Sequence, residues 1–245
     1  MLDLATDAVV RALGETGVRT TRWNTEQYPF NECLTTAFSP GTIEPRAELT
    51  RAAAGTLPLD DVTSVWYRRV RRPERPAGMD PGVYDFCIRE SHAALVGTLL
   101  GAMPATARWM SDPRAVWAAE HKLLQLSTAR RVGLSIPETV VTNDPAEVRI
   151  AYHRFKGEMI AKPTRSGYLE VEDQPYSIYT SQILAEHVEA LDGAELSPVI
   201  YQPLIPKRCD VRVTAVGDWL FAAEIDSQGD EAARVDWRRT ANSSL

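Results

Sequence analysis

The stretch "VIYQPLIPKRCDVRVTAVGDWLFAAEIDSQ", residues 199–228, decides how the fold of this chain is interpreted. It opens on a short apolar run that meets a Gln-Pro pair, and a basic loop follows at 206–208. Two extended runs then flank a Gly-Asp pair, which is typical of a tight β-hairpin. The order of these features predicts a strand, then a basic loop, then a hairpin. Asp210 and Arg212 are expected on one face of that hairpin, because side chains alternate along a strand.

The residues before this stretch alternate between helix and strand signals. An Asp-Pro pair at 112–113 supplies an N-cap and a first helical residue, which predicts one helix ending at Gly133. The same pair recurs at 144–145, where Glu147 would close a capping box, and predicts a second helix. Short β-rich runs predict strands at 138–144, 158–163 and 176–184, and a further helix is expected at 184–193.

The first hundred residues carry fewer signals. Amphipathic periodicity predicts a helix over 4–17, a β-rich run lies at 60–70, and a helical period runs over 84–103. Breaks fall near Pro104 and Pro198. We therefore expect an α/β chain of three subdomains, with the limits 1–105, 106–198 and 199–245. The last subdomain is too short to close its own core and is expected to be incomplete.

Composition narrows the classes of function. The chain has 245 residues and a formal net charge of −6, with a pI of about 5.3. Because phosphate-backbone binding needs a basic field, nucleic acid is not the expected partner, although a local basic site for a small anion fits these values. The cysteines Cys33, Cys87 and Cys209 cannot all pair and lack metal spacing, which favours a reduced, cytoplasmic setting. No apolar run reaches the roughly 18 residues of a membrane span, so no membrane partner is expected.

Two lysines are candidates for binding an anion. Lys162 ends the apolar run "EMIAKP", where a lysine either extends to solvent or meets an anion such as phosphate. Gly167 follows in a polar turn that is placed to lie over a phosphate. Lys122 lies in "AEHKLLQ", among the leucines of a predicted helix. Taken singly, each lysine is better explained as an ordinary surface residue.

The opening stretch adds groups that suit a nucleotide. An apolar strand that enters a linker can offer backbone N–H and C=O groups to a flat ring, with Leu204 and Ile205 covering it. Asp210 suits a ribose hydroxyl or the orientation of Arg212, and Arg212 suits phosphate oxygens. The alternative is a plain hairpin with a cross-strand ion pair, worth under about 1 kcal/mol. That alternative does not explain why the pair follows two lysines and precedes Arg238.

With these motifs in this order, the sequence resembles the ATP-grasp ligases. Within them it resembles the enzymes that mature ribosomal peptides of the graspetide (microviridin) type. The resemblance runs over nearly the whole chain and implies an α/β (α+β) ATP-grasp fold of three subdomains. It is carried by the segments "SVWYRRVRRP", "WMSDPRAVWAAEHKLLQLSTARRVGLSIPETVVTNDP", "MIAKP", "SIYTSQ", the opening stretch and "DWRR".

The resemblance also implies roles for single residues. Lys122 and Lys162 correspond to two nucleotide-binding lysines. Asp210 and Arg212 match an Asp-x-Arg motif that follows the hinge, and Arg238 matches the arginine of an Asp-aromatic-Arg motif on the phosphate side. These two arginines are the catalytic candidates. The hinge that clasps adenine corresponds to Gln202, Pro203, Leu204 and Ile205.

The resemblance implies a reaction as well. The cofactors would be ATP and Mg²⁺, and the metal ligands are unassigned. A side-chain carboxylate of a ribosomal precursor peptide would become an acyl phosphate, which a hydroxyl or amine then attacks to close an ester or amide ring. The central subdomain would hold the leader of that peptide, and the enzyme would be a homodimer.

The sequence departs from this family at its ends. Nothing after Arg238 matches the acidic residues and the Glu-x-Asn that hold magnesium, and no first strand precedes Leu2. We therefore expect a truncated form, or one that needs further segments, and no ring closure by residues 1–245 alone. Two other functions stay open, namely a ligase that adds single amino acids to a peptide and a non-catalytic, peptide-binding relic.

Overall fold

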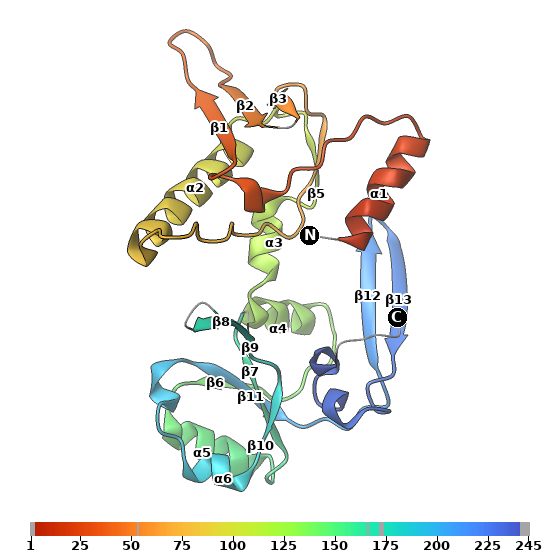
Figure 1. Ribbon diagram of the computed structural model, residues 1–245. Coiled ribbons are helices and arrows are strands. Elements are labelled where there is room, and N and C mark those ends of the chain that lie inside the picture. Colours follow the sequence, from red (N-terminus) through yellow and green to blue (C-terminus); the bar gives the residue numbers. More distant parts are fainter. Residues whose placement is uncertain (1–2, 53, 166, 172–173, 241–245) are drawn as a thin grey trace. The chain divides into compact units, whose positions relative to one another are not determined.

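The computed structural model describes residues 3–52, 54–165, 167–171 and 174–240 (Figure 1). The chain forms two compact units, Met1–Pro113 and Arg114–Leu245. The division into three subdomains at 105 and 198 stays a prediction.

In the first unit, the two expected helices form. Helix α1 (Leu4–Glu15) begins where the side chain of Asp3 accepts a hydrogen bond from the backbone N–H of Thr6. Helix α2 (Pro81–Gly101) begins with proline, and Asp80 caps it by accepting from the N–H groups of Gly82 and Val83. A single turn of 3-10 helix, η1 (Thr25–Gln27), lies between them in the sequence. Local capping chemistry therefore fixes both helix starts.

The sheet of the first unit is not predicted by the sequence. Strands β1 (Glu32–Ala37), β2 (Arg46–Arg51) and β3 (Gly55–Pro58) form an antiparallel sheet in that order. Strand β4 (Ser64–Trp66), which lies within the β-rich run at 60–70, pairs in parallel with β5 (Arg108–Met110). A small buried cluster holds the sheet to neighbouring segments, and its members are Ala47, Leu49, Leu59 and Ala102.

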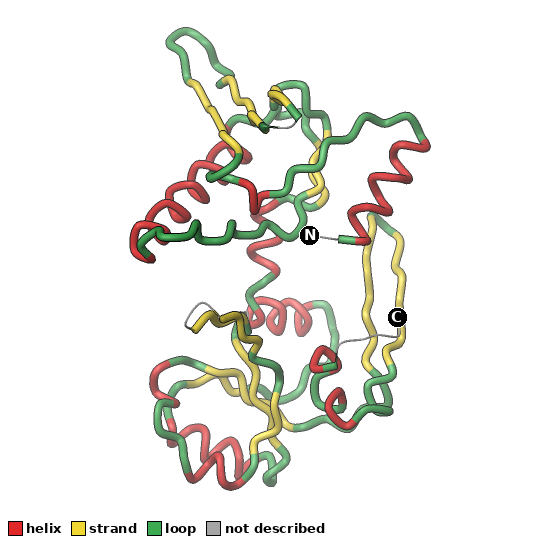
Figure 2. Tube along the Cα trace, viewed as in Figure 1, coloured by secondary structure: helices red, strands yellow, loops and turns green. Residues whose placement is uncertain are grey.

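The second unit contains a four-stranded antiparallel sheet in the order β10-β7-β11-β6. Its strands are labelled in Figure 1 and drawn in yellow in Figure 2. Its strands are β6 (Val140–Thr142), β7 (Met159–Pro163), β10 (Ser181–Ile183) and β11 (Val199–Pro203). All four lie within strand segments that the sequence predicts. Strand β11, which the sequence places at the start of the third subdomain, pairs with β6 and β7.

One face of this sheet packs against helix α5 (Pro145–Arg154), beside which lies α6 (Ala185–Glu189) (Figure 1). The buried cluster comprises Val148, Ala151, Phe155, Met159 and Tyr201. Along β7 the side chains alternate, so Met159 and Ala161 belong to this core while Lys162 is directed to the opposite face. The core thus fixes where Lys162 lies.

Two β-hairpins complete the second unit. The hairpin expected at the Gly-Asp pair is confirmed as β12 (Asp210–Val216) and β13 (Trp219–Ile225). The apolar residues Val213 and Leu220 of this hairpin are exposed. Strands β8 (Tyr168–Val171) and β9 (Gln174–Ser177) form the other hairpin. Single turns of 3-10 helix lie at η2 (Ala194–Leu196), η3 (Glu231–Ala233) and η4 (Trp237–Arg239).

Three local predictions are wrong. The helix expected from 112 to 133 is two helices, α3 (Pro113–Ala119) and α4 (Lys122–Arg131). His121 has an extended backbone between them, and the side chain of Gln125 donates to Ala119 O at 2.6 Å, which satisfies a carbonyl at the end of α3. The run expected as one strand over 176–184 is divided between β9 and β10.

The third correction concerns the start of α5. Asp144 caps this helix as expected, accepting from the N–H of Ala146 at 2.8 Å. The backbone N–H of Asp144 donates to Thr142 Oγ1, so it is the threonine, and not Glu147, that satisfies this donor. A hydroxyl two residues earlier thus replaces the expected capping box.

No helix in the described part of the chain is long and apolar enough to cross a membrane.

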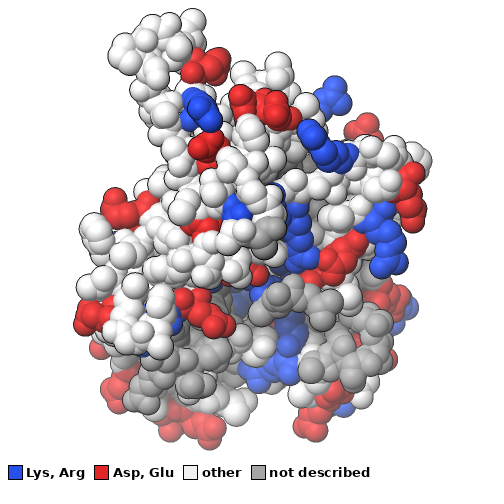
Figure 3. Space-filling view, turned by 45° about the horizontal axis from the view of Figure 1, so that its top comes forward, with Lys and Arg blue, Asp and Glu red and all other residues white. Residues whose placement is uncertain are grey.

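Basic and acidic side chains are interspersed on the face of the molecule shown in Figure 3.

Candidate functional site

Lys162 occupies the end of a central strand. β7 pairs with β10 on one side and with β11 on the other, and Lys162 lies opposite Ile200 of β11, whose exposed fraction is 0%. Burial lowers the pKa of Lys162, and the positive charges of Lys122 and Arg238 lower it further. A half-buried ammonium beside two other cations is unfavourable in the free protein, and an anion would relieve this cost.

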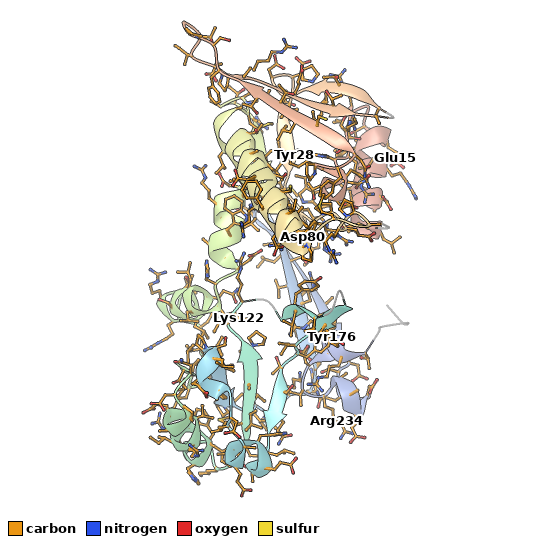
Figure 4. All side chains as sticks on the ribbon, turned by 60° about the vertical axis from the view of Figure 1, so that its left-hand side comes forward. Glu15, Tyr28, Asp80, Lys122, Tyr176 and Arg234 are labelled. Carbon is orange, nitrogen blue, oxygen red and sulfur yellow. The ribbon has the colours of Figure 1, made fainter. Side chains whose placement is uncertain are left out.

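Lys122 approaches the same strand end from another element. It is the first residue of α4, directly after the break at His121 (Figure 4). Its Nζ donates to Pro163 O of β7 at 2.5 Å. Burial lowers its pKa, the charge of Arg238 lowers it further, and Asp236 opposes that effect. The division of the predicted helix therefore places Lys122 at the end of β7.

Arg238 comes from the single turn η4. Its Nε and Nη2 donate to the two carboxylate oxygens of Asp236, at 2.7 Å and 2.6 Å. This pairing raises the pKa of Arg238. The side chain of Arg238 is 58% exposed, so the guanidinium retains donors for a ligand after both contacts are made.

Lys122, Lys162 and Arg238 thus form a cation cluster. Lys122 contacts the end of β7, and Arg238 is joined through Asp236 to the residue before β10, the neighbour of β7. The charges of Lys122 and Arg238 lower the pKa of Lys162. They come from α4, β7 and η4, which are far apart in the sequence but all belong to the second unit. Three converging cations suit a polyphosphate, since lysine offers a point charge and arginine a fork of donors.

The residues expected to form the adenine hinge lie at the end of β11 and directly after it. Gln202 is buried, and its Nε2 donates to Thr139 Oγ1 at 2.8 Å. The N–H of Leu204 donates to Glu158 O at 2.9 Å. Pro203 is half-buried, and Ile205 is exposed beyond the strand. The side chain of Gln202 and the N–H of Leu204 therefore serve the sheet, and the role of 202–205 in holding a ring stays a prediction.

Asp210 and Arg212 of the Asp-x-Arg motif have different surroundings. Asp210 accepts from Lys207 Nζ at 2.7 Å, an ion pair between the basic loop and the start of β12. Arg212 lies opposite Ala223 and is exposed, and no hydrogen bond or ion pair of Arg212 is seen within the described ranges. Asp210 contributes to the raised pKa of Arg238, so it lies near the cation cluster. The structure thus links Asp210 to the cluster through charge, while the catalytic role of Arg212 stays a prediction.

The sequence offered no role for Asp236, Lys207 and Glu120. Glu120 accepts from the Nε and Nη2 of Arg165, at 3.0 Å and 2.5 Å, and so joins the α3–α4 break to the segment after β7. A signal for Asp236 was present, because Asp-x-Arg occurs at 210–212 and again at 236–238. The partners of Lys207 and Glu120 depend on the fold and leave no local pattern.

Gly167 lies at the base of the β8–β9 hairpin. The N–H of Ile178 donates to Gly167 O at 2.6 Å, and a Cβ at Gly167 would lie 2.0 Å from Ile178 O. The glycine is therefore required by a close backbone approach. Its position over a phosphate stays a prediction.

Metal ligands stay unassigned. Among the residues that the structure describes, no group of three or more His, Cys, Asp or Glu side chains lies close enough to hold a metal ion. The carboxylates near the cation cluster, Asp210 and Asp236, are engaged by Lys207 and Arg238. These residues therefore do not fit a magnesium site, and no step is assigned to a metal.

Comparisons with known proteins identify the family and the fold. Residues 3–116 match the family model described as the MvdD pre-ATP grasp domain. A Chryseobacterium gregarium RiPP-associated ATP-grasp ligase, solved with ADP and a leader and core peptide, is 28% identical with a TM-score of 0.81. The match covers 95% of this chain and 68% of that one. No curated protein matched this chain by sequence.

Two enzymes of Microcystis aeruginosa MRC are similar over comparable lengths. Macrocyclase MdnB is 30% identical with a TM-score of 0.77, and the match covers 93% of this chain and 73% of that one. Macrocyclase MdnC, solved with the precursor peptide MdnA, is 27% identical with a TM-score of 0.81 and the same coverage. The fold is therefore that of the ATP-grasp enzymes. Within that class, the chain belongs to the ATP-grasp ligases of ribosomally synthesised and modified peptides (RiPPs), the family of the MdnB and MdnC macrocyclases.

Proposed function

We propose that this protein activates side-chain carboxylates of a ribosomal precursor peptide as acyl phosphates and joins them to hydroxyls or amines of the same peptide. The products are macrocycles closed by esters or amides. The observation that carries the proposal is the convergence of Lys122, Lys162 and Arg238 at the end of β7. The similar enzymes support it, since they include two macrocyclases and a ligase solved with ADP and peptide.

The chemistry explains why cations are the main requirement. A carboxylate is a poor electrophile, so its oxygen attacks the γ-phosphorus of ATP, ADP leaves, and an acyl phosphate forms. The hydroxyl or amine then attacks the acyl carbon, loses its proton, and releases inorganic phosphate. During the first step, negative charge is spread over the oxygens of the transferred phosphoryl group, and positioned cations stabilise that arrangement.

The cofactor proposed for this site is ATP, which in solution carries Mg²⁺. Lys122, Lys162 and Arg238 would hold its phosphates, Asp210 and Arg212 would lie on the ribose and phosphate side, and 202–205 would hold adenine. The sequence-based expectations of a homodimer and a cytoplasmic setting are part of the same proposal.

The test is co-expression of the protein with a candidate precursor rich in acidic and Thr residues, followed by mass spectrometry. Loss of one water per ring supports the proposal. A gain of whole amino-acid residues indicates instead a ligase that extends peptides. An unmodified peptide, from a protein that binds ADP but does not hydrolyse ATP, indicates a non-catalytic relic.

Matched variants link the chemistry to the site. Lys122→Met should abolish ring formation because it removes one cation of the cluster. Lys156→Met is the control, since Lys156 is an exposed lysine at the end of α5 in the same unit. Equal activity of the two variants would contradict the assignment of the cation cluster as the phosphate site.

A further inference from the structure

Asp236 is an almost fully buried carboxylate, with a side-chain exposed fraction of 2%. It accepts four hydrogen bonds: from Arg238 Nε, Arg238 Nη2 and the N–H of Arg238, and from the N–H of Thr180 at 3.0 Å. Burial alone would raise its pKa, but the hydrogen bonds from Arg238 and Thr180 lower the pKa to about 2. Asp236 is thus ionised at neutral pH. Its carboxylate accepts hydrogen bonds from Arg238 in η4 and from Thr180, the residue before β10.

We infer that Asp236 is a positioning residue that holds Arg238 at the phosphate site. The inference rests on the proposed function, because it takes the cation cluster to be that site. Asp236 itself has no free oxygen to offer a nucleotide, since both oxygens accept from Arg238 and one also accepts from Thr180. Its effect on binding would therefore act through Arg238.

Electrostatics explains why such a residue is needed. The charge of Arg238 lowers the pKa of both Lys122 and Lys162, so the three cations repel one another in the free protein. Arg238 is more than half exposed and comes from a single turn, so little packing prevents its side chain from moving into solvent. The bidentate pair with Asp236 opposes that movement and fixes the plane of the guanidinium.

A second contact joins η4 to β10 and provides a control. Arg239 Nη2 donates to Ser181 Oγ at 2.5 Å, and its guanidinium lies 5.9 Å from the centre of the Tyr179 ring. Ser181→Ala removes a contact between η4 and β10 without affecting Arg238. Asp236→Asn removes a contact at the same junction and also releases Arg238. A purely structural role predicts similar effects of both variants on nucleotide binding, whereas a positioning role predicts an effect of Asp236→Asn only.

The experiment is calorimetric titration of ADP and adenosine into the protein and its variants, with thermal melting to confirm folding. We expect Asp236→Asn to weaken ADP binding by roughly tenfold, the usual size for loss of one charge-assisted contact. Adenosine binding should be unchanged in Asp236→Asn, and Ser181→Ala should bind ADP like the wild type. In the double variant Asp236→Asn/Arg238→Gln, ADP should bind as weakly as to Arg238→Gln alone, because Asp236 acts through Arg238.

Several results would overturn the inference. Wild-type ADP affinity in Asp236→Asn would overturn it. A loss of ADP affinity on adding Asp236→Asn to Arg238→Gln, as large as the loss in the single variant, would also overturn it. If Asp236→Asn does not fold, Arg238→Lys replaces it, because lysine keeps the charge but cannot engage both carboxylate oxygens side by side. Arg238→Lys should then bind ADP about as weakly as Arg238→Gln, and wild-type affinity would refute the inference. A wild-type protein that binds no ADP would contradict the proposed function itself, and the inference with it.

Discussion

Replacing Lys162 with methionine is predicted to weaken nucleotide binding and to stabilise the unliganded protein. The ammonium of Lys162 is half-buried, and its pKa is lowered by burial and by the charges of Lys122 and Arg238. Methionine keeps most of the aliphatic length on β7 and removes the charge. Since the charge is unfavourable in the empty site, its removal should raise the free energy of unfolding by about 0.5–2 kcal/mol, as is common at functional positions.

The loss of affinity should be larger than the gain in stability. A charge-assisted hydrogen bond contributes about 1.5–3 kcal/mol, so the Kd for ADP should rise by roughly 10–150-fold. Thermal melting should show a Tm increase of roughly 2–4 °C per kcal/mol for a chain of this length. Lys156→Met is the matched control and should change neither quantity. A Lys162→Met protein that melts lower and still binds ADP like the wild type would refute the reasoning.

Three further predictions concern pH, the core and the hairpin. Bound phosphate favours protonated Lys162, so ADP affinity should fall as the pH rises from the lowered pKa of Lys162 towards the ordinary 10.5. ADP binding should also take up protons, which calorimetry in buffers of different ionisation enthalpy measures. Constant ADP affinity over that pH range would contradict the prediction. Met159→Ala should lower the free energy of unfolding by about 2–5 kcal/mol, because Met159 is fully buried in the core under α5. Denaturant titrations measure this, with Leu196→Ala as the control because Leu196 is exposed. Equal losses of unfolding free energy in the two variants would argue against that core. Gly167→Ala should open the base of the β8–β9 hairpin, because the added Cβ would lie 2.0 Å from Ile178 O. The expected result is faster proteolysis of this hairpin. An unchanged digest would show that the backbones of Gly167 and Ile178 do not approach so closely.

Sequence patterns predicted the elements whose signals are local. Asp144 and Pro145 mark the start of α5, and the Gly-Asp pair marks the β12–β13 hairpin, because capping and turn chemistry depend on residues a few positions apart. The break between α3 and α4 was missed because the side chain of Gln125 stabilises it from within the next helix. Strands β1 to β3 were missed because their pairing is held by contacts with distant segments such as α2. One of these contacts is the hydrogen bond between the hydroxyls of Thr36 and Thr98.

The site was predicted less completely than the fold. The resemblance pointed to Lys122, Lys162 and Arg238, and the structure brings these three together. The pairing of Asp210 with Lys207, in place of Arg212, could not be predicted, because the path of the basic loop 206–208 sets which cation reaches the carboxylate. Ion pairs of this kind are decided by tertiary geometry.

The most direct measurement is the position of a bound nucleotide, determined from a crystal structure of the protein with ADP. We predict that phosphate oxygens lie within about 2.7–3.2 Å of Lys122 Nζ, Lys162 Nζ and a nitrogen of Arg238. Asp236 should keep both of its contacts with the guanidinium of Arg238 in the complex. ADP bound elsewhere in the second unit, with Lys122 Nζ still on Pro163 O and no phosphate near Lys162, would contradict the account.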